Sequence, residues 1–152
     1  MRRVEEYMTP GPRVIRSDLP LRQAAEEMKE SGVHHLPVVE GDGLVGLLTA
    51  DDLRAYDECS ELVRIRLRVE DVMIPMPYAV PGTAPLREVV EAMIAGRYSA
   101  AVVRDDGRVS GVFTLTDALR ALAEVLGEAE VEPAPPRRAP GDALGVRSCD
   151  AG

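Results

Sequence analysis

A short motif that could bind a ligand occurs twice in this sequence. The pattern Gly-x-x-Thr-x-x-Asp contains Thr49 and Asp52 in one copy and Thr114 and Asp117 in the other. A threonine that begins a helix lies beside backbone N–H groups without intrahelical partners, a suitable place for phosphate or ribose oxygens. A carboxylate three residues later would face the same side, and it can accept both hydroxyl protons of a ribose. The motif therefore suits a nucleotide.

The same motif has a second interpretation that needs no ligand. In a capping box, the threonine hydroxyl accepts a hydrogen bond from the third helical N–H, and the side chain of that third residue bonds back to the threonine N–H. Capping boxes are common signals at helix starts. Duplication of the segment would copy a cap as readily as a binding site, so the sequence leaves both interpretations open.

The two motifs belong to a longer internal repeat. When residue n is set against residue n+65 without gaps, Met8-x-Pro10-x-Pro12 falls on Met73-x-Pro75-x-Pro77, and Pro20-Leu21-Arg22 falls on Pro85-Leu86-Arg87. Such a match indicates a duplicated structural unit, and two units can bury a shared face and form a cleft between them. We therefore expect the functional site at the interface of the repeats.

The 152 residues divide into two repeats and two other segments. Residues 4–56 form the first predicted repeat, residues 57–68 a linking helix, and residues 69–126 the second repeat. A repeat of roughly 60 residues is marginal as an independent fold, so we expect one cooperative unit. Residues 127–152 are predicted to be a disordered Pro-rich tail, because prolines occur there without hydrophobic periodicity.

Each repeat is predicted to contain a strand, a helix, two strands and a second helix. Apolar residues recur at helical spacing over 21–28 and again over 86–93, which predicts an amphipathic helix in each repeat. Asp18 and Thr83 are candidate N-caps for these helices.

Two hairpins complete the predicted fold. Asp-Gly pairs at 42–43 and 106–107 lie between β-rich runs, the usual signal of a tight hairpin. The fold class is therefore α+β, with two β-α-β-β-α repeats packed in pseudo-twofold symmetry.

Composition and charge exclude several classes of protein. A formal net charge of −8 and 3% aromatic residues do not fit nucleic-acid binding, which relies on cations and aromatic platforms. No apolar run approaches the ~18 residues that span a bilayer, and the N-terminus lacks the apolar core of a signal peptide. Cys59 and Cys149 form neither a disulfide framework nor a metal-ligand pattern. We expect a cytoplasmic protein that binds no nucleic acid, membrane or metal.

Taken together, these residues make the chain similar to a pair of cystathionine-β-synthase (CBS) domains. The similarity rests on Met-x-Pro before the first strand, on Leu36-Pro37-Val38-Val39 after Gly-Val-His-His, and on the segments 46–52 and 111–117. It covers both repeats and leaves the tail outside. The resemblance implies a regulatory module that binds AMP, ADP or ATP in clefts between the repeats, with S-adenosylmethionine as a weaker candidate.

The resemblance also implies which residues contact the ligand. Asp52 and Asp117 would hold ribose, Thr49 and Thr114 would touch ribose or phosphate, and backbone of the strands would hold the adenine edge. The predicted contacts are Ile15, His34, His35, Leu36, Pro37, Thr49, Asp52, Val80, Ser99, Ala100, Ala101, Thr114, Thr116 and Asp117.

The two repeats differ at one pair of these positions. His34 and His35 stand where some family members place basic residues that contact phosphate, and Ser99 and Ala100 are the counterparts in repeat 2. Adjacent strand residues point to opposite faces, so we expect at most one histidine to face a given cleft. The alternative is one packed and one solvated histidine. We therefore expect two unequal clefts.

Two functions fit the sequence. The first is a sensor of adenosine nucleotides, and the second is a structural or dimerisation module with empty or degenerate clefts that binds a protein partner. A homodimer is expected because the apolar stripe of Leu86, Val89, Val90, Met93 and Ile94 is wider than one core-facing helix needs. No nucleophile stands beside a His–carboxylate pair, so the sequence does not predict an enzyme.

Overall fold

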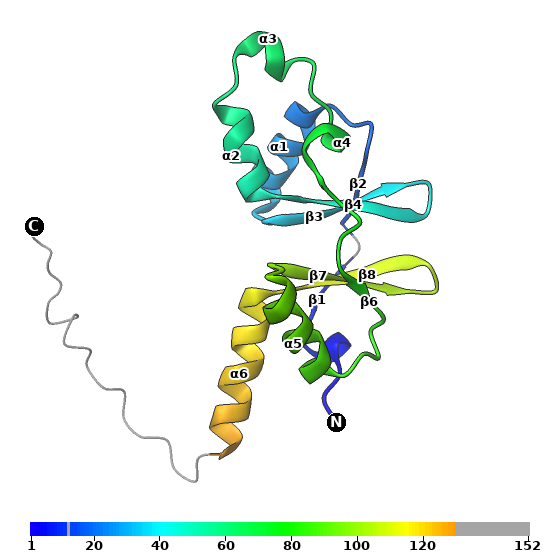
Figure 1. Cartoon of the computed structure of the whole chain (residues 1–152), viewed down its shortest axis with the longest axis vertical. Helices are drawn as coiled ribbons and strands as arrows, with labels where there is room; N and C mark the ends of the chain where they lie inside the picture. Colours follow the sequence, from blue (N-terminus) through cyan, green and yellow to red (C-terminus); the bar gives the residue numbers. More distant parts are fainter. Residues whose placement is uncertain (12, 130–152) are drawn as a thin grey trace, which may run out of the picture. The chain divides into compact units, whose positions relative to one another are not determined.

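The structure is a computed structural model that describes residues 1–11 and 13–129 (Figure 1). The chain divides into two compact units, Met1–Ala121 and Leu122–Gly152. Both β-sheets lie within the first unit.

The elements of the first repeat are η1 (Val4–Glu6), β1 (Thr9–Pro10), β2 (Ile15–Arg16), α1 (Leu21–Ser31), β3 (His35–Glu40), β4 (Gly43–Thr49) and α2 (Ala50–Asp57). After α3 (Glu61–Arg64), the second repeat contains α4 (Val69–Val72), β5 (Ile74–Pro75), β6 (Ala79–Val80), α5 (Leu86–Gly96), β7 (Ala100–Asp105), β8 (Arg108–Thr114) and α6 (Leu115–Ala129). The order β2-α1-β3-β4-α2 matches β6-α5-β7-β8-α6. The predicted α+β class and the β-α-β-β-α repeat are confirmed.

Each sheet contains one strand from the other repeat. The strand orders are β2-β3-β4-β5 and β1-β8-β7-β6. Thr9 of β1 lies opposite Val112 of β8, and Ile74 of β5 lies opposite Leu47 of β4. Thr9 and Ile74 are counterparts in the n+65 register, so the exchange is reciprocal. Neither sheet is complete with one repeat alone.

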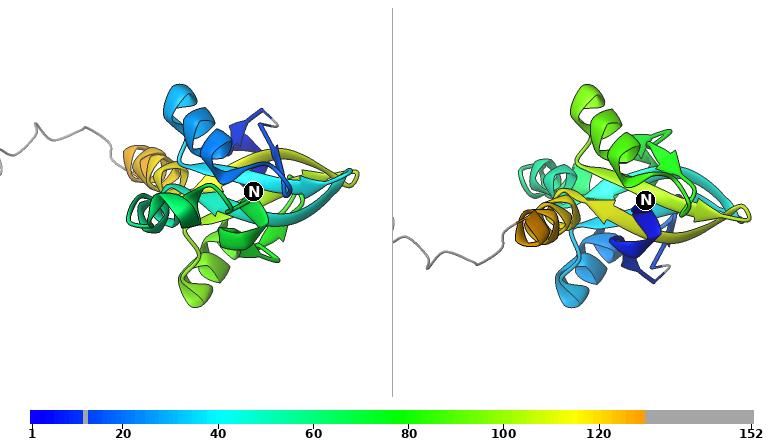
Figure 2. Two further views of the ribbon diagram at one scale, coloured as in Figure 1. Left: turned by 90° about the horizontal axis from the view of Figure 1, so that it is seen from above. Right: turned by 90° about the horizontal axis from the view of Figure 1, so that it is seen from below.

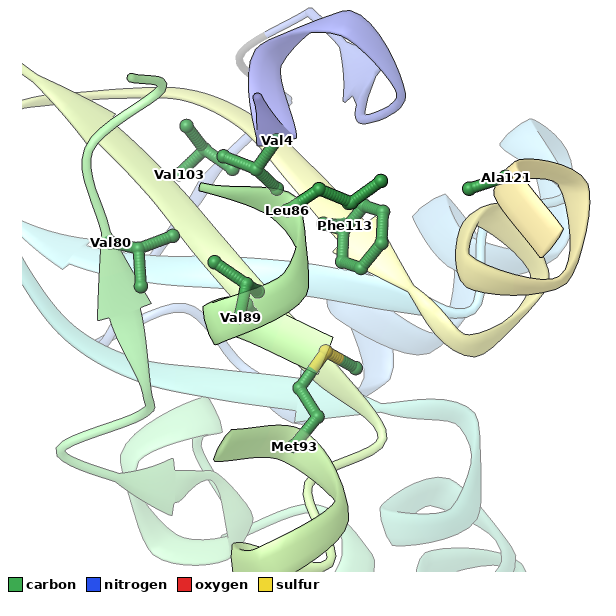
Figure 3. Packing of buried hydrophobic residues seen from close by; sticks show 9 residues of the cluster. Val4, Val80, Leu86, Val89, Met93, Val103, Phe113 and Ala121 are labelled. Atoms are coloured by element: carbon green, nitrogen blue, oxygen red, sulfur yellow. The ribbon is translucent and has the colours of Figure 1, made fainter. Parts of the chain in front are cut away.

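Apolar side chains fill both the outer and the inner faces of the sheets. Figures 1 and 2 show α1 and α5 on opposite outer sides. Between the sheets, Leu47 of β4 and Val102 of β7 belong to one buried cluster. On the outer face of the second sheet, Val4 from the N-terminal segment packs with Leu86 and Phe113 (Figure 3). The N-terminal segment thus completes the core of the second repeat.

The first helices, α1 and α5, begin later than predicted. The N-cap of each is the proline directly before the helix, so the predicted caps, Asp18 and Thr83, are wrong. The first N–H of α1 donates to the Leu67 carbonyl at 3.0 Å, and the first N–H of α5 donates to the Arg2 carbonyl at 2.9 Å. In each case the acceptor is the backbone of a segment distant in the sequence, which takes the place of a side-chain cap.

The apolar stripe of α5 is mostly used by the core. Leu86, Val89 and Met93 are buried and Val90 is half-buried, whereas Ile94 is 72% exposed. The width of this stripe therefore gives little support to the predicted dimer, because a single core covers most of it.

Two segments outside the repeats differ from their predicted structure. Within 57–68, for which the sequence predicts a linking helix, the helical residues after α2 are Glu61–Arg64. Two of the apolar residues on which the predicted helix rested, Leu62 and Ile65, do not belong to a core, since they are 71% and 58% exposed. At the other end, α6 continues to Ala129, three residues into the predicted tail. Residues 130–152 of that tail lie outside the described part of the chain.

None of the described helices is both long and apolar enough to cross a bilayer.

Candidate functional site

A cleft of about 830 Å³ lies between the two repeats. Its walls come from the end of β1, from the turn between α1 and β3, and from the junction of β8 and α6. The predicted site residues that line it are His34, His35, Ser99, Thr114, Thr116 and Asp117. The structure therefore brings together the histidine pair of one repeat and the Thr-x-x-Asp motif of the other.

The Asp117 carboxylate is the most densely bonded group in this cleft. Its side chain is 1% exposed. It accepts hydrogen bonds from the Thr114 backbone N–H at 2.9 Å, from the Thr114 hydroxyl at 3.1 Å, and from the Thr9 hydroxyl at 3.2 Å to each carboxylate oxygen. Arg120 donates from Nη1 at 2.9 Å. A ribose could therefore bind this carboxylate only by replacing Thr9 or Arg120, since the Thr114 bonds belong to the helix cap.

The counterpart carboxylate, Asp52, has a simpler environment. Its Oδ2 accepts from the Thr49 backbone N–H and hydroxyl, both at 2.9 Å, and its own N–H donates to the Thr49 hydroxyl at 3.3 Å. The counterparts of Thr9 and Arg120 are Ile74 and Ala55, which carry no side-chain donor. Asp52 is thus held by its capping box, whereas Asp117 is held by a capping box and two further groups.

Both copies of the motif therefore form the capping box that the second interpretation predicted. A carboxylate that caps a helix keeps lone pairs for other donors, as the contacts of Asp117 to Thr9 and Arg120 demonstrate. The cap alone neither requires nor excludes a ligand. Contact of Asp52 or Asp117 with ribose stays a prediction.

Both histidines line the cleft, where the sequence predicted at most one; His34 is exposed and His35 is half-buried. The reason is that β3 begins at His35, and His34 in the preceding turn is not bound by strand alternation. Nε2 of His35 lies 3.4 Å from the Ser99 hydroxyl. Burial, and secondarily the nearby His34, lowers the pKa of His35 below the ordinary value of 6.5.

Two arginines that the sequence did not single out also line the cleft. Arg120 is 71% exposed in its side chain and pairs with Asp117 at 2.9 Å, and Arg13 lies 3.5 Å from Glu27. The Arg13–Glu27 pair is exposed and therefore weak, whereas Arg120 reaches from an exposed side chain to a buried carboxylate. Arg120 follows Asp117 by one helical turn, a spacing that could have predicted its contact. Arg13 carried no comparable signal.

The remaining predicted residues lie away from this cleft or in the cores. Thr49 is buried and Asp52 half-buried at the start of α2. The side chains predicted near an adenine edge are buried among apolar neighbours, and they are Ile15, Leu36, Pro37, Val80, Ala100 and Ala101. Their backbone contacts with a ligand stay predictions.

Comparison with known proteins agrees with the duplicated architecture. Residues 4–58 and 69–124 each match the CBS domain. The chain belongs to the CBS domain family. This confirms the resemblance read from the sequence. A CBS domain-containing protein of Dictyostelium discoideum is 30% identical in an alignment of 145 residues that covers 88% of this chain and 97% of that relative.

Solved CBS pairs share the fold. The CBS domain pair of protein MJ0100, solved with 5-methylthioadenosine and S-adenosyl-L-methionine, has a TM-score of 0.69 at 25% identity. The match covers 80% of this CBS chain and 99% of the MJ0100 chain. CBSX2 of Arabidopsis thaliana, solved with AMP, has a TM-score of 0.73 at 23% identity, covering 82% and 99%. At that identity the second comparison supports the fold alone.

Proposed function

We propose that this CBS pair is a regulatory module that senses an adenosine nucleotide, AMP, ADP or ATP, in the cleft lined by Thr114 and Asp117. The supporting observation is that a cleft built by both repeats brings this threonine and carboxylate together with two histidines and two arginines. Its volume of about 830 Å³ falls within the range of small-molecule sites, about 300–1,000 Å³. The MJ0100 pair, solved with two adenosine compounds, supports the same ligand class.

The phosphate and the ribose of a nucleotide each have a suitable partner in this cleft. The guanidinium groups of Arg13 and Arg120 suit phosphate, because a planar fork can donate two hydrogen bonds to one phosphate group. Asp117 suits the ribose diol as an acceptor-only group. His35 would enter as a neutral imidazole, since burial lowers its pKa, and it would contribute hydrogen bonding rather than charge. S-adenosylmethionine is the weaker candidate, because it lacks the phosphate that would use the arginines.

Because the repeats exchange strands, a ligand bound in this cleft would contact both repeats. A ligand in this cleft would touch β1 from the first repeat and α6 from the second, which meet at the Thr9–Asp117 hydrogen bond. Occupancy can regulate a dimer or a protein partner only if the ligand binds one arrangement of the repeats more tightly than another.

We propose a regulatory role for the module and not a catalytic one. The Ser99–His35 pair, at 3.4 Å, is the arrangement in the cleft closest to a nucleophile and base. A catalytic pair also needs a group that orients the base. Among the described residues, no hydrogen bond joins His35 to a carboxylate.

We also propose that the module is a homodimer. Ile94 of α5 and Leu115 and Leu119 of α6 are 72%, 55% and 65% exposed. Leu115 and Leu119 lie one turn apart on the same helix face, and a twofold partner could cover them. The second candidate function, a structural module that binds a protein partner with degenerate clefts, would use the same exposed side chains.

A ligand screen separates the two functions. Thermal unfolding and isothermal titration calorimetry would be run with AMP, ADP, ATP and S-adenosylmethionine, with GMP as the control for the adenine ring. A ligand that binds only the folded state adds about 2.7 kcal/mol of stability at 100-fold over Kd. Stabilisation by an adenosine nucleotide and not by GMP is the expected result. No response to millimolar adenosine compounds would favour the structural module.

A further inference from the structure

The n+65 register places a second potential cleft at the counterparts of the residues that line the first. Arg13 and Val33 line the described cleft, and their counterparts are Tyr78 and Tyr98. The two tyrosine rings stack on each other, with centroids 5.1 Å apart and planes inclined by 19°. Two residues that line the described cleft thus correspond to two tyrosines that contact each other in the other half of the pseudo-symmetric pair.

The stacked rings leave no room for an adenine between them. Carbon atoms in contact lie about 3.5–4 Å apart, so an inserted base would need ring planes roughly 7 Å apart. A centroid distance of 5.1 Å therefore excludes a third ring unless the tyrosines separate.

The position of Tyr98 is supported by the glycine at the end of α5. A Cβ on Gly96 would overlap the Tyr98 ring, so the ring lies directly against the helix backbone. The counterpart of Gly96 in the first repeat is Ser31, and the counterpart of Tyr98 there is Val33. Both positions of this contact thus differ between the repeats, and the absence of a side chain at Gly96 allows the Tyr98 ring to pack against the helix. Tyr78 is half-buried and Tyr98 is 44% exposed, and desolvation raises the pKa of the Tyr78 hydroxyl.

We propose that Tyr78 and Tyr98 close the second cleft, so that each chain binds one nucleotide, at Asp117, and not two. This inference rests on the proposed function and specifies its stoichiometry. Asp52, the counterpart of Asp117, keeps only its capping role while the tyrosines are stacked. The pseudo-twofold pair would therefore be functionally asymmetric.

The test exchanges the tyrosines for the residues of the first repeat. AMP, and ATP in parallel, would be titrated by calorimetry into the full chain, into Tyr78→Arg/Tyr98→Val, and into Tyr78→Phe/Tyr98→Phe, which keeps both rings. We expect one site per chain in the parent and the phenylalanine variant, and two sites in the Arg/Val variant. Asp117→Ala should weaken the parent site ten- to a hundredfold, and Asp52→Ala should abolish only the second site of the Arg/Val variant.

Other results would overturn the inference. Two sites per parent chain, or a parent site that depends on Asp52, would show that the tyrosines do not close the second cleft. A single site in a folded Arg/Val variant would show that they are not what closes it. Tyr98→Val alone and Gly96→Ser, which displaces the ring, provide milder openings if the double variant does not fold. Absence of AMP and ATP binding in every variant would refute the proposed function, and the inference with it.

Discussion

Replacing each motif aspartate by alanine distinguishes a carboxylate that only caps a helix from one that also joins the two repeats. Asp52→Ala removes a capping box, which contributes typically about 1 kcal/mol to the free energy of unfolding. Asp117→Ala removes the same box together with the hydrogen bonds from the Thr9 hydroxyl, which add about 1 kcal/mol. Solvent screens the Arg120 guanidinium, which is 71% exposed, although the Asp117 carboxylate is 1% exposed, so we expect this pair to add less than the Thr9 bonds. We therefore expect losses of about 1 kcal/mol for Asp52→Ala and about 2 kcal/mol for Asp117→Ala.

The assay is urea denaturation of the ligand-free variants, followed by far-UV circular dichroism. Thr9→Val is the matched control, because it removes the hydroxyl bond to Asp117 and leaves the capping box intact. It should cost about 1 kcal/mol in the parent and nothing further in Asp117→Ala, since interacting groups are not additive.

Nucleotide titration of the same variants completes the prediction. Loss of a charge-assisted contact to ribose costs about 1.5–3 kcal/mol, or roughly ten- to a hundredfold in affinity. This loss is expected for Asp117→Ala and not for Asp52→Ala. Equal losses of stability, or an AMP affinity unchanged by Asp117→Ala, would refute the distinction drawn between the two carboxylates.

Three further predictions follow from burial and charge. Burial lowers the pKa of His35 below 6.5 in the folded state. The folded state therefore binds fewer protons than the unfolded state, and stability should fall as pH drops below about 6.5. Denaturation at pH 5.5 and 7.5 should show that His35→Gln reduces this pH dependence more than His34→Gln does. Val4 and its counterpart Val69 are fully buried in opposite cores. Val4→Ala should therefore cost about 2 kcal/mol of folding free energy and raise amide hydrogen exchange in the second repeat, whereas Val69→Ala should raise it in the first. Increases in exchange confined to the mutated segment would contradict this. Leu119→Arg should convert a dimer into a monomer in light scattering, and a monomeric parent would remove the dimer proposal.

The repeated elements were predictable because their signals are local. Apolar residues at helical spacing predict α1 and α5, and both hairpins form where Asp-Gly pairs predict them. The pair at 106–107 makes the second turn, whereas the first turn consists of Gly41 and Asp42, because Gly43 already belongs to β4. Similarly, Thr49 and Thr114 precede α2 and α6 as the capping motif requires. Each of these features depends on residues within a few positions of one another, so a single pass along the sequence can find them.

The strand exchange and the full site could not be read in this way. β1 and β5 have two residues each, too few for an alternating pattern. Thr9 reaches Asp117 across 108 residues of sequence, a pairing that only the fold creates. The stacking of Tyr78 on Tyr98 depends on ring orientation as well as on backbone position. Composition gave only a low aromatic content and no sign that two of the four tyrosines meet.

The two interpretations of the Thr-x-x-Asp motif become compatible once the repeats are compared. Helix capping alone accounts for the geometry of Thr49 and Asp52, because every hydrogen bond that their side chains make within the described part of the chain joins one to the other. In the second repeat the same cap faces a cleft with two arginines and binds a strand from the other repeat. A duplicated motif therefore does not imply a duplicated site. The cap explains why both copies have these residue types, and the surroundings of Asp117 are the reason that ligand binding is proposed for that copy alone.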